Sequence, residues 1–154
     1  MLDKLKTLHG NLELPAFFPE ATLGFVREVP TKDLEKTKTD GVIANTYHLL
    51  RLNLVEEIKE KGGFQKFMDF EKPVISDSGG FQVMSLIRNN GFGKIYDDRV
   101  VFKLNGIETE LTPEKCIEIQ IKIGSDIVMC LDDSRCRSSS ITRRRPGATG
   151  GPPA

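Results

Sequence analysis

The chain has 154 residues, and its 22 basic and 22 acidic side chains give a formal net charge of zero. The charge is unevenly distributed, because residues 1–134 hold 17 basic and 22 acidic side chains, while residues 135–154 hold five arginines and no acid. Residues 1–134 are therefore not expected to bind polyanions through bulk charge, and no run approaches the roughly 18 apolar residues of a membrane-spanning helix.

Extended and helical patterns alternate along the first part of the chain. Thr31 is predicted to cap a short helix, and Gly62 and Gly63 are predicted to end a longer one. Apolar runs and helical periodicity predict, in chain order, an extended segment over 12–18, a helix over 31–38, a strand over 42–44, a helix over 50–61, a strand over 73–76 and a helix over 81–88.

A hairpin and a final helix are predicted in the second part. Two alternating apolar segments, 100–104 and 107–111, flank Asn105-Gly106, a strong signal for a tight hairpin turn. Thr112-Pro113 then predicts a helix start, with Thr as the N-cap and Pro in the first position. Residues 127–131 are the last predicted strand.

The segment 76–82 has the most distinctive chemistry. It holds a carboxylate, a hydroxyl, an amide and an aromatic ring around two glycines: Asp77, Ser78, Gly79, Gly80, Phe81 and Gln82. Glycines let a flat ligand approach main-chain N–H groups, and the other side chains offer hydrogen bonds and a stacking face. No basic residue lies between Lys72 and Arg88, which favours a purine-like heterocycle over a phosphate. The same residues also suit an ordinary turn that caps the next segment.

Polar residues follow three of the predicted strands. Asn45 and Asp77 directly follow or end two of them, and Asp132 follows the last. In a β/α barrel the carboxyl ends of the strands form one active-site mouth, so these side chains are predicted to meet there. Polar residues follow most strands, and the pattern alone also fits coincidence.

No metal site is predicted in this chain. Cys116, Cys130 and Cys136 lack the paired spacing of a zinc site, and His9 and His48 lie far from them in sequence. His48 is interpreted as a packing residue in a strand-to-loop segment. Residues 1–6 lack the apolar core of a signal peptide, and the expected location is the cytoplasm.

Several motifs in one order resemble the tRNA-guanine transglycosylases. They are Leu8-His9-Gly10, residues 14–19, the run Asn45-Thr46-Tyr47-His48-Leu49, residues 77–83, and residues 111–133. The resemblance implies exchange of the tRNA wobble guanine for a 7-deazaguanine, queuine or its precursor, without a redox cofactor. The implied partners are tRNA and the guanine or deazaguanine base.

The resemblance also implies an α/β fold with a (β/α)8 TIM-like barrel. Such a barrel takes roughly 250 residues, so the expected fold is the N-terminal half of a barrel over residues 1–134, with an N-terminal extended segment and an inserted β-hairpin. The family's other half carries the aspartate nucleophile and a structural zinc, and a homodimer through that half is expected. Residues 135–154 are predicted to be a disordered tail, either RNA-binding or foreign to the family.

By motif match, the resemblance gives roles to individual residues. Asp77 is implied as the general acid/base, Asp132 as the acceptor for the purine edge, and Phe81 as the stacking residue. Gln82 and the backbone of Ser78, Gly79 and Gly80 are implied to line the pocket, and Asn45 to orient Asp77 or the ribose. Asp133-Ser134 departs from the Glu-Cys that many members have there.

Three alternatives to the queuine-type enzyme stay open at this point. Two belong to the same superfamily: the archaeosine-forming branch, which modifies a different tRNA site, and a non-catalytic accessory subunit. The third belongs to a different class, a purine-binding module that retains the pocket without the nucleophile.

Overall fold

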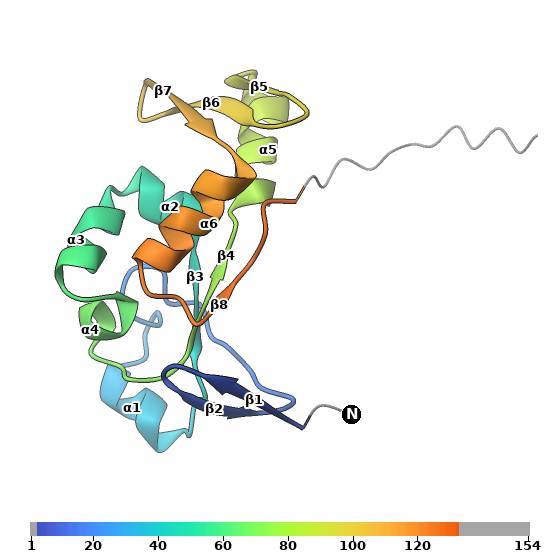
Figure 1. Cartoon of the computed structure of the whole chain (residues 1–154). Helices are drawn as coiled ribbons and strands as arrows, with labels where there is room; N and C mark the ends of the chain where they lie inside the picture. Colours follow the sequence, from blue (N-terminus) through green and yellow to red (C-terminus); the bar gives the residue numbers. More distant parts are fainter. Residues whose placement is uncertain (1–2, 133–154) are drawn as a thin grey trace, which may run out of the picture.

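The computed structural model describes residues 3–132, a mixed α/β arrangement of helices and three small sheets (Figure 1). The predictions for Asp133 and for the tail over 135–154 lie outside the described residues. The elements in chain order are β1 (Lys4–Thr7), β2 (Gly10–Glu13), α1 (Thr31–Lys36), β3 (Val42–Asn45), α2 (Thr46–Arg51), α3 (Leu54–Glu60), α4 (Phe64–Met68), β4 (Val74–Asp77), α5 (Gly80–Asn90), β5 (Gly93–Ile95), β6 (Val100–Leu104), β7 (Ile107–Leu111), α6 (Pro113–Lys122) and β8 (Ile127–Val128).

A parallel sheet in the order β3-β4-β8 forms the centre of the molecule. In Figure 1 the helices α3, α4 and α6 lie on one side of it. Alternate residues face these helices and are fully buried, as the two-residue period of a strand requires, among them Val42, Ala44 and Val74. Ile43 and Ile75 point to the other face and are only half-buried. Within residues 3–132 these strands do not close into a barrel.

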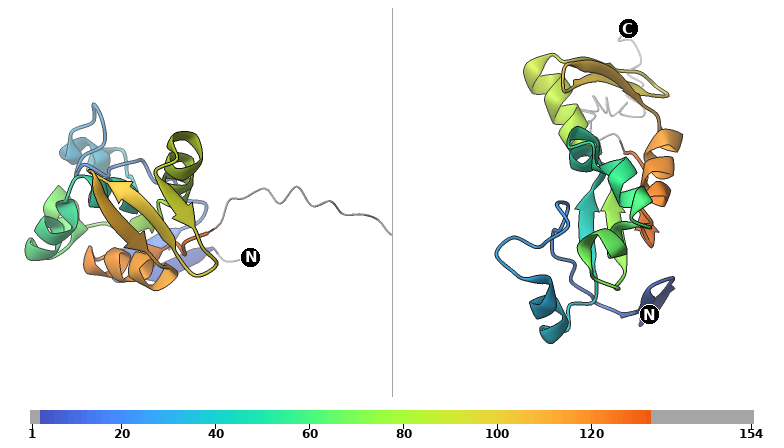
Figure 2. Two further views of the ribbon diagram at one scale, coloured as in Figure 1. Left: turned by 90° about the horizontal axis from the view of Figure 1, so that it is seen from above. Right: turned by 90° about the vertical axis from the view of Figure 1, so that its left-hand side faces the viewer.

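A second, antiparallel sheet in the order β5-β6-β7 lies beyond the carboxyl ends of the parallel strands (Figures 1 and 2). The predicted hairpin is confirmed, with strands over the predicted ranges. Both turn residues have positive φ, 51° at Asn105 and 83° at Gly106, as expected for a turn whose twist matches the strands. Strand β5 was not predicted; its three residues are too short for a clear alternating pattern.

The β1–β2 hairpin lies at the opposite end of the parallel sheet (Figure 1). Its turn is fastened to the sheet by Asp126, whose side chain is 0% exposed. The Asp126 carboxylate accepts hydrogen bonds from the backbone N–H of His9 at 3.1 Å and of Val74 at 2.9 Å, and lies 3.0 Å from the His9 Nδ1. The Gln65 amide donates to the same carboxylate at 3.1 Å. The opening motif that contains His9 therefore has a structural role here.

Asp126→Asn is expected to lower stability at neutral pH more than at acid pH. Burial acts to raise the pKa of Asp126, but the hydrogen bonds from Val74 and His9 outweigh it and lower that pKa below the usual 3.8. A carboxylate with a lowered folded-state pKa stabilises the fold above its unfolded pKa, and this contribution is lost as the pH falls through the folded-state value. The difference in melting temperature between the two proteins should be constant near neutral pH and shrink as the pH falls below 3.8.

Asp40 is the matched control, because it is exposed and has no hydrogen-bond partner among residues 3–132. Asp40→Asn should leave the melting temperature nearly unchanged over the same pH range. A melting-temperature difference for Asp126→Asn that stays constant with pH would contradict the linkage.

Three predicted boundaries are wrong. The helix predicted over 50–61 is two helices, α2 and α3, because Asn53 takes the left-handed conformation with φ 56° and breaks the run. Thr31 is the first residue of α1 and not its cap, which is Pro30. The strand predicted over 127–131 ends at Val128; beyond it the Met129 N–H is shared between the Ser76 carbonyl and the Gln120 Oε1, and the Met129 carbonyl accepts from the Gln120 Nε2.

Other predictions are confirmed in whole or in part. The strands at 42–44 and 73–76 are confirmed as β3 and β4, with one-residue shifts at their ends. Thr112 is the N-cap of α6, and its hydroxyl accepts from the Lys115 N–H at 3.2 Å. The segment predicted as extended over 12–18 is a strand only to Glu13. No helix in the described part of the chain is long and apolar enough to cross a membrane.

Candidate active site

Asp77 and Asn45 lie side by side at the carboxyl ends of β4 and β3, where the strand register pairs them directly. The Asn45 Nδ2 donates to the Asp77 Oδ2 at 2.9 Å, while the Asn45 Oδ1 accepts from the His48 N–H at 3.0 Å and so caps α2. Both ends of the Asn45 amide are therefore engaged, which fixes its orientation. The meeting of these two strand ends agrees with the sequence-based expectation.

The turn after Asp77 depends on the two glycines. Gly79 has φ +69°, and a Cβ on it would lie 2.5 Å from the Cβ of Tyr47, so no larger residue fits. Its N–H donates to the Asp77 Oδ1 at 2.8 Å. The Ser78 side chain is buried, and its Oγ accepts from the Gly80 N–H at 3.2 Å. Ser78 therefore supports the turn in this structure, beside any contact with a ligand.

Helix α6 forms hydrogen bonds with this turn and with the end of β4. The Cys116 Sγ, which is fully buried, donates to the Ser78 carbonyl at 3.6 Å. Burial raises the pKa of the Cys116 thiol to about 11, so the thiol stays protonated and able to donate near neutral pH. One turn later, the Gln120 Oε1 accepts from the Ser76 hydroxyl at 2.8 Å. Both contacts fix the strand that carries Asp77.

Burial is also the main influence on Asp77 itself. It raises the pKa of the Asp77 carboxyl above the ordinary 3.8, although the hydrogen bonds from Gly79 and Asn45 and the charge of His48 act in the opposite direction. The nearby Glu20 adds to the rise. A carboxyl with a raised pKa keeps a proton to higher pH, which suits a group that donates and accepts protons in turn.

A cavity of about 450 Å³ opens beside Asp77. Its wall includes both hydrogen-bonded partners, Asp77 and Asn45, and the predicted pocket residue Gln82 from α5. The other lining residues are Glu20, Thr22, Leu23, Ile43, Ala44, His48, Arg51 and Leu52. We call this the Asp77 cavity.

Four polar residues of the Asp77 cavity were not predicted as site residues: Glu20, Thr22, His48 and Arg51. Glu20 and Thr22 reach it because residues 19–22 run parallel to β3, with a bridge from Glu20 to Ile43 and a bond from the Asn45 N–H to the Thr22 Oγ1 at 2.8 Å. His48 lies on α2 and not in a strand-to-loop segment. Its spacing of three from Asn45 is the signal that places both at one end of a helix.

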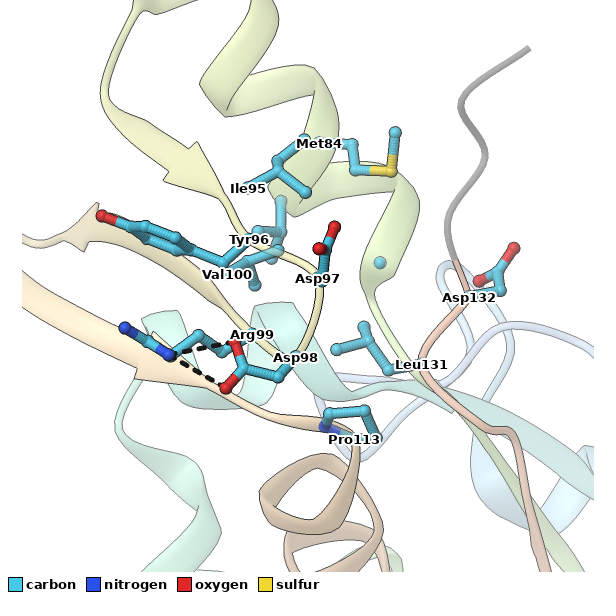
Figure 3. Close-up of a pocket in the computed structure, with 12 residues that line it drawn as sticks. Met84, Ile95, Tyr96, Asp97, Asp98, Arg99, Val100, Pro113, Leu131 and Asp132 are labelled. Carbon is cyan, nitrogen blue, oxygen red and sulfur yellow. Dashed lines mark hydrogen bonds and ion pairs between the residues drawn. The ribbon is translucent and has the colours of Figure 1, made fainter. Parts of the chain in front are cut away.

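Asp132 lies in a different hollow, which Figure 3 shows and which Gly80 also lines. This smaller pocket, about 110 Å³, also contains Asp97, Asp98 and Leu131. A Cβ on Gly80 would lie 3.3 Å from the Asp132 Oδ1, so Asp132 is a close neighbour of the glycine turn. Asp132 is exposed and lies four residues beyond the last residue of β8.

Phe81 lines neither of these two pockets. Its side chain is 70% exposed on the first turn of α5, beside Met84 and Arg88. The structure thus brings together Asn45, Asp77 and Gln82, places Asp132 next to them beyond a glycine turn, and leaves Phe81 apart. No cluster of three or more metal-binding side chains occurs within residues 3–132.

Comparison with known proteins agrees with these motifs. The family model described as "Queuine tRNA-ribosyltransferase" matches residues 2–146. A protein of that name from Caulobacter vibrioides is 41% identical over 146 residues, covering 93% of this chain and 38% of the relative. One from Prochlorococcus marinus strain MIT 9211 is 45% identical over 130 residues, covering 83% of this chain and 34% of the relative.

A third relative gives a similar match. A queuine tRNA-ribosyltransferase from Dictyoglomus turgidum is 41% identical over 133 residues, covering 85% of this chain and 34% of the relative. The chain thus spans little more than a third of the length of the curated relatives it matches. With the family model covering nearly all of its residues, this chain belongs to the queuine tRNA-ribosyltransferase family.

Proposed function

We propose that this chain is part of an enzyme that exchanges the wobble guanine of tRNA for a 7-deazaguanine, queuine or its precursor. The observation that carries the proposal is the carboxyl of Asp77, held at a strand end by Asn45 and Gly79 with a raised pKa, beside an open cavity. The names of the relatives agree with this reaction.

The chemistry requires two acidic groups. Breaking the glycosidic bond passes through an oxocarbenium-like transition state, and a carboxylate nucleophile can hold the ribose as a covalent intermediate while a second acid transfers the proton of the base. We assign the second role to Asp77, because its raised pKa suits proton transfer. The nucleophile is proposed to lie in the part of the relatives that this chain does not span.

The purine is proposed to lie over the Gly79–Gly80 turn, between Asp77 and Asp132. Gly80 lines the hollow of Asp132, and the Asp132 side chain lies close enough to this glycine to reach the edge of a base placed there. A carboxylate accepts well from ring N–H and amino donors. Phe81 would stack on the base after turning toward the glycine turn, from the exposed position that it has here.

The finer fold is proposed to be part of a (β/α)8 barrel. Two features support this proposal. The strands β3, β4 and β8 are parallel and carry helices on one side, and the opposite face of the sheet, which includes Ile43 and Ile75, is only half-buried. Further strands would extend such a sheet into a barrel. The structural zinc and any homodimer contacts are proposed for the part outside this chain, and the cytoplasm, where tRNA is modified, as the location.

Joining residues 1–132 to the remainder of the Caulobacter vibrioides relative tests the function. The joined protein should incorporate labelled guanine into tRNA, while the 154-residue chain alone should give no more than the no-enzyme background, because the nucleophile is missing. Turnover by the chain alone would contradict the placement of the nucleophile. A folded joined protein that binds tRNA but exchanges no base would contradict the function.

A further inference from the structure

A third cavity, about 300 Å³, lies between α2, α5 and the turn of the β6–β7 hairpin. We call it the Phe92 pocket, and its lining residues are Tyr47, Arg51, Leu86, Phe92, Lys103, Leu104, Asn105 and Gly106. Figure 1 shows the β6–β7 turn above α2. The Asn105 Nδ2 donates to the Arg51 carbonyl at 2.7 Å and fastens this turn to the end of α2. The pocket is therefore closed on that side by a defined contact.

Phe92 places an exposed aromatic ring at this pocket. The Phe92 side chain is 51% exposed, yet its carbonyl accepts from the Lys103 N–H at 2.9 Å, which fixes its backbone beside β6. An exposed, positioned aromatic ring offers a face on which a nucleobase can stack, and such stacking does not depend on base identity.

Two cations flank the ring. Neither Arg51 nor Lys103 has a carboxylate within ion-pair distance in residues 3–132, whereas the nearby Arg99 and Lys115 are both paired with Glu110. No acidic residue lines the pocket. The lining of the pocket is therefore positive, although Glu108 lies opposite Lys103 in the strand register and the chain over residues 1–134 is acidic in total. Free cations beside an aromatic face are the features with which proteins bind single-stranded nucleic acid.

The pocket is adjacent to the Asp77 cavity. Arg51 lines both of them. On α5, Gln82 lines the Asp77 cavity and Leu86, one turn further on, lines the Phe92 pocket. A strand with one nucleotide at Asp77 can therefore pass over Arg51 into the second pocket.

We propose that the Phe92 pocket binds the nucleotide that neighbours the exchanged guanosine in a single-stranded RNA loop. Phe92 stacks on the base, and Arg51 and Lys103 bind the flanking phosphates. The proposal rests on the proposed function, since it needs an RNA substrate at Asp77, and adds a second subsite to it.

Tryptophan fluorescence gives a direct test, because the chain contains no tryptophan. Phe92→Trp places one indole in the pocket and keeps a stacking face. The probe is a single-stranded oligoribonucleotide with one guanosine in a run of uridines, and its binding to the 154-residue chain is followed separately by anisotropy. Binding should quench the indole at position 92. Phe17→Trp, at a 78% exposed site that lines neither cavity, should not be quenched.

Affinity measurements separate the contribution of stacking on Phe92 from that of the phosphate contact at Lys103. Phe92→Leu should weaken binding by about 5- to 150-fold, the usual range for one stacked base. Lys103→Gln should lower the slope of log affinity against log salt by about 0.7, the value for one phosphate contact with a single strand. Lys32→Gln, an exposed lysine on α1 that is unpaired within residues 3–132, is the matched control. Thermal melting of each variant should match that of the parent chain.

Several outcomes would overturn the subsite. They are RNA binding without quenching at position 92, equal effects of Lys103→Gln and Lys32→Gln, quenching by free guanosine monophosphate at the same concentration, or no RNA binding at all. The proposed function rests on Asp77 and its cavity and not on the Phe92 pocket. Failure of the subsite would therefore leave the proposed function standing, whereas loss of exchange in a folded joined protein would remove the function itself.

Discussion

Asp77→Asn in the joined protein should lower kcat for guanine exchange by roughly 10²–10⁴, the usual contribution of general acid–base catalysis. The amide has nearly the shape of the carboxyl and can still accept from the Gly79 N–H, but its NH2 group then faces the Asn45 Nδ2 donor, and it cannot take up or release the proton of the base. Because the side chain keeps its size, KM for tRNA should change less than kcat. The measurement is steady-state incorporation of labelled guanine into tRNA.

Asp132→Asn should raise KM for the base in the same assay and have a smaller effect on kcat. Replacing one acceptor oxygen by a donor leaves a purine N–H without a partner, which costs about 1–3 kcal/mol. The main effect should be a higher KM for the base and weaker discrimination between purines. Asp98→Asn is the control, since Asp98 lines the same hollow but pairs with Arg99. Near-normal kcat for Asp77→Asn, or unchanged base affinity for Asp132→Asn, would show that the roles are wrong.

Gln120→Leu should lower the free energy of unfolding by roughly 2–4 kcal/mol, a large share of the 5–15 kcal/mol typical of a domain. The Gln120 side chain is fully buried and uses its whole hydrogen-bonding capacity. Its Oε1 accepts from the Ser76 hydroxyl and the Met129 N–H, and its Nε2 donates to the carbonyls of Cys116 and Met129. Leucine would leave the buried Ser76 hydroxyl without a partner and remove the bonds to the Met129 backbone. Urea unfolding measures the change.

Glu118→Leu on the same helix is the matched control, because Glu118 is exposed and has no ion pair within residues 3–132. Its effect should stay within about 0.5 kcal/mol. If both substitutions have the same effect, Gln120 does not join α6 to the sheet in the way described. If Gln120→Leu also changes the pH dependence of base exchange in the joined protein, the contact extends to the position of Asp77.

Local signals predicted the hairpin and the start of α6. Asn105-Gly106 requires two positive φ angles, and Thr112-Pro113 supplies a cap and a preset φ, so in each case two adjacent residues decide the structure. The break at Asn53 has no such signal, because asparagine is also found inside helices. Local sequence also does not reveal the partner of the Met129 carbonyl just after β8, which is a glutamine side chain from α6.

The sequence by itself determined the family, the order of the motifs, and the candidate residues Asn45, Asp77 and Gln82, because residue types at fixed spacing are a local property. Only the tertiary structure decided which side chains share a cavity. It joined Asp77 to Asn45 across two strands and brought Glu20 to the same wall. It also placed Asp132 in a separate hollow beside Gly80. Such distances depend on parallel strand register and on the packing of helices far apart in the chain, which no single stretch of sequence contains.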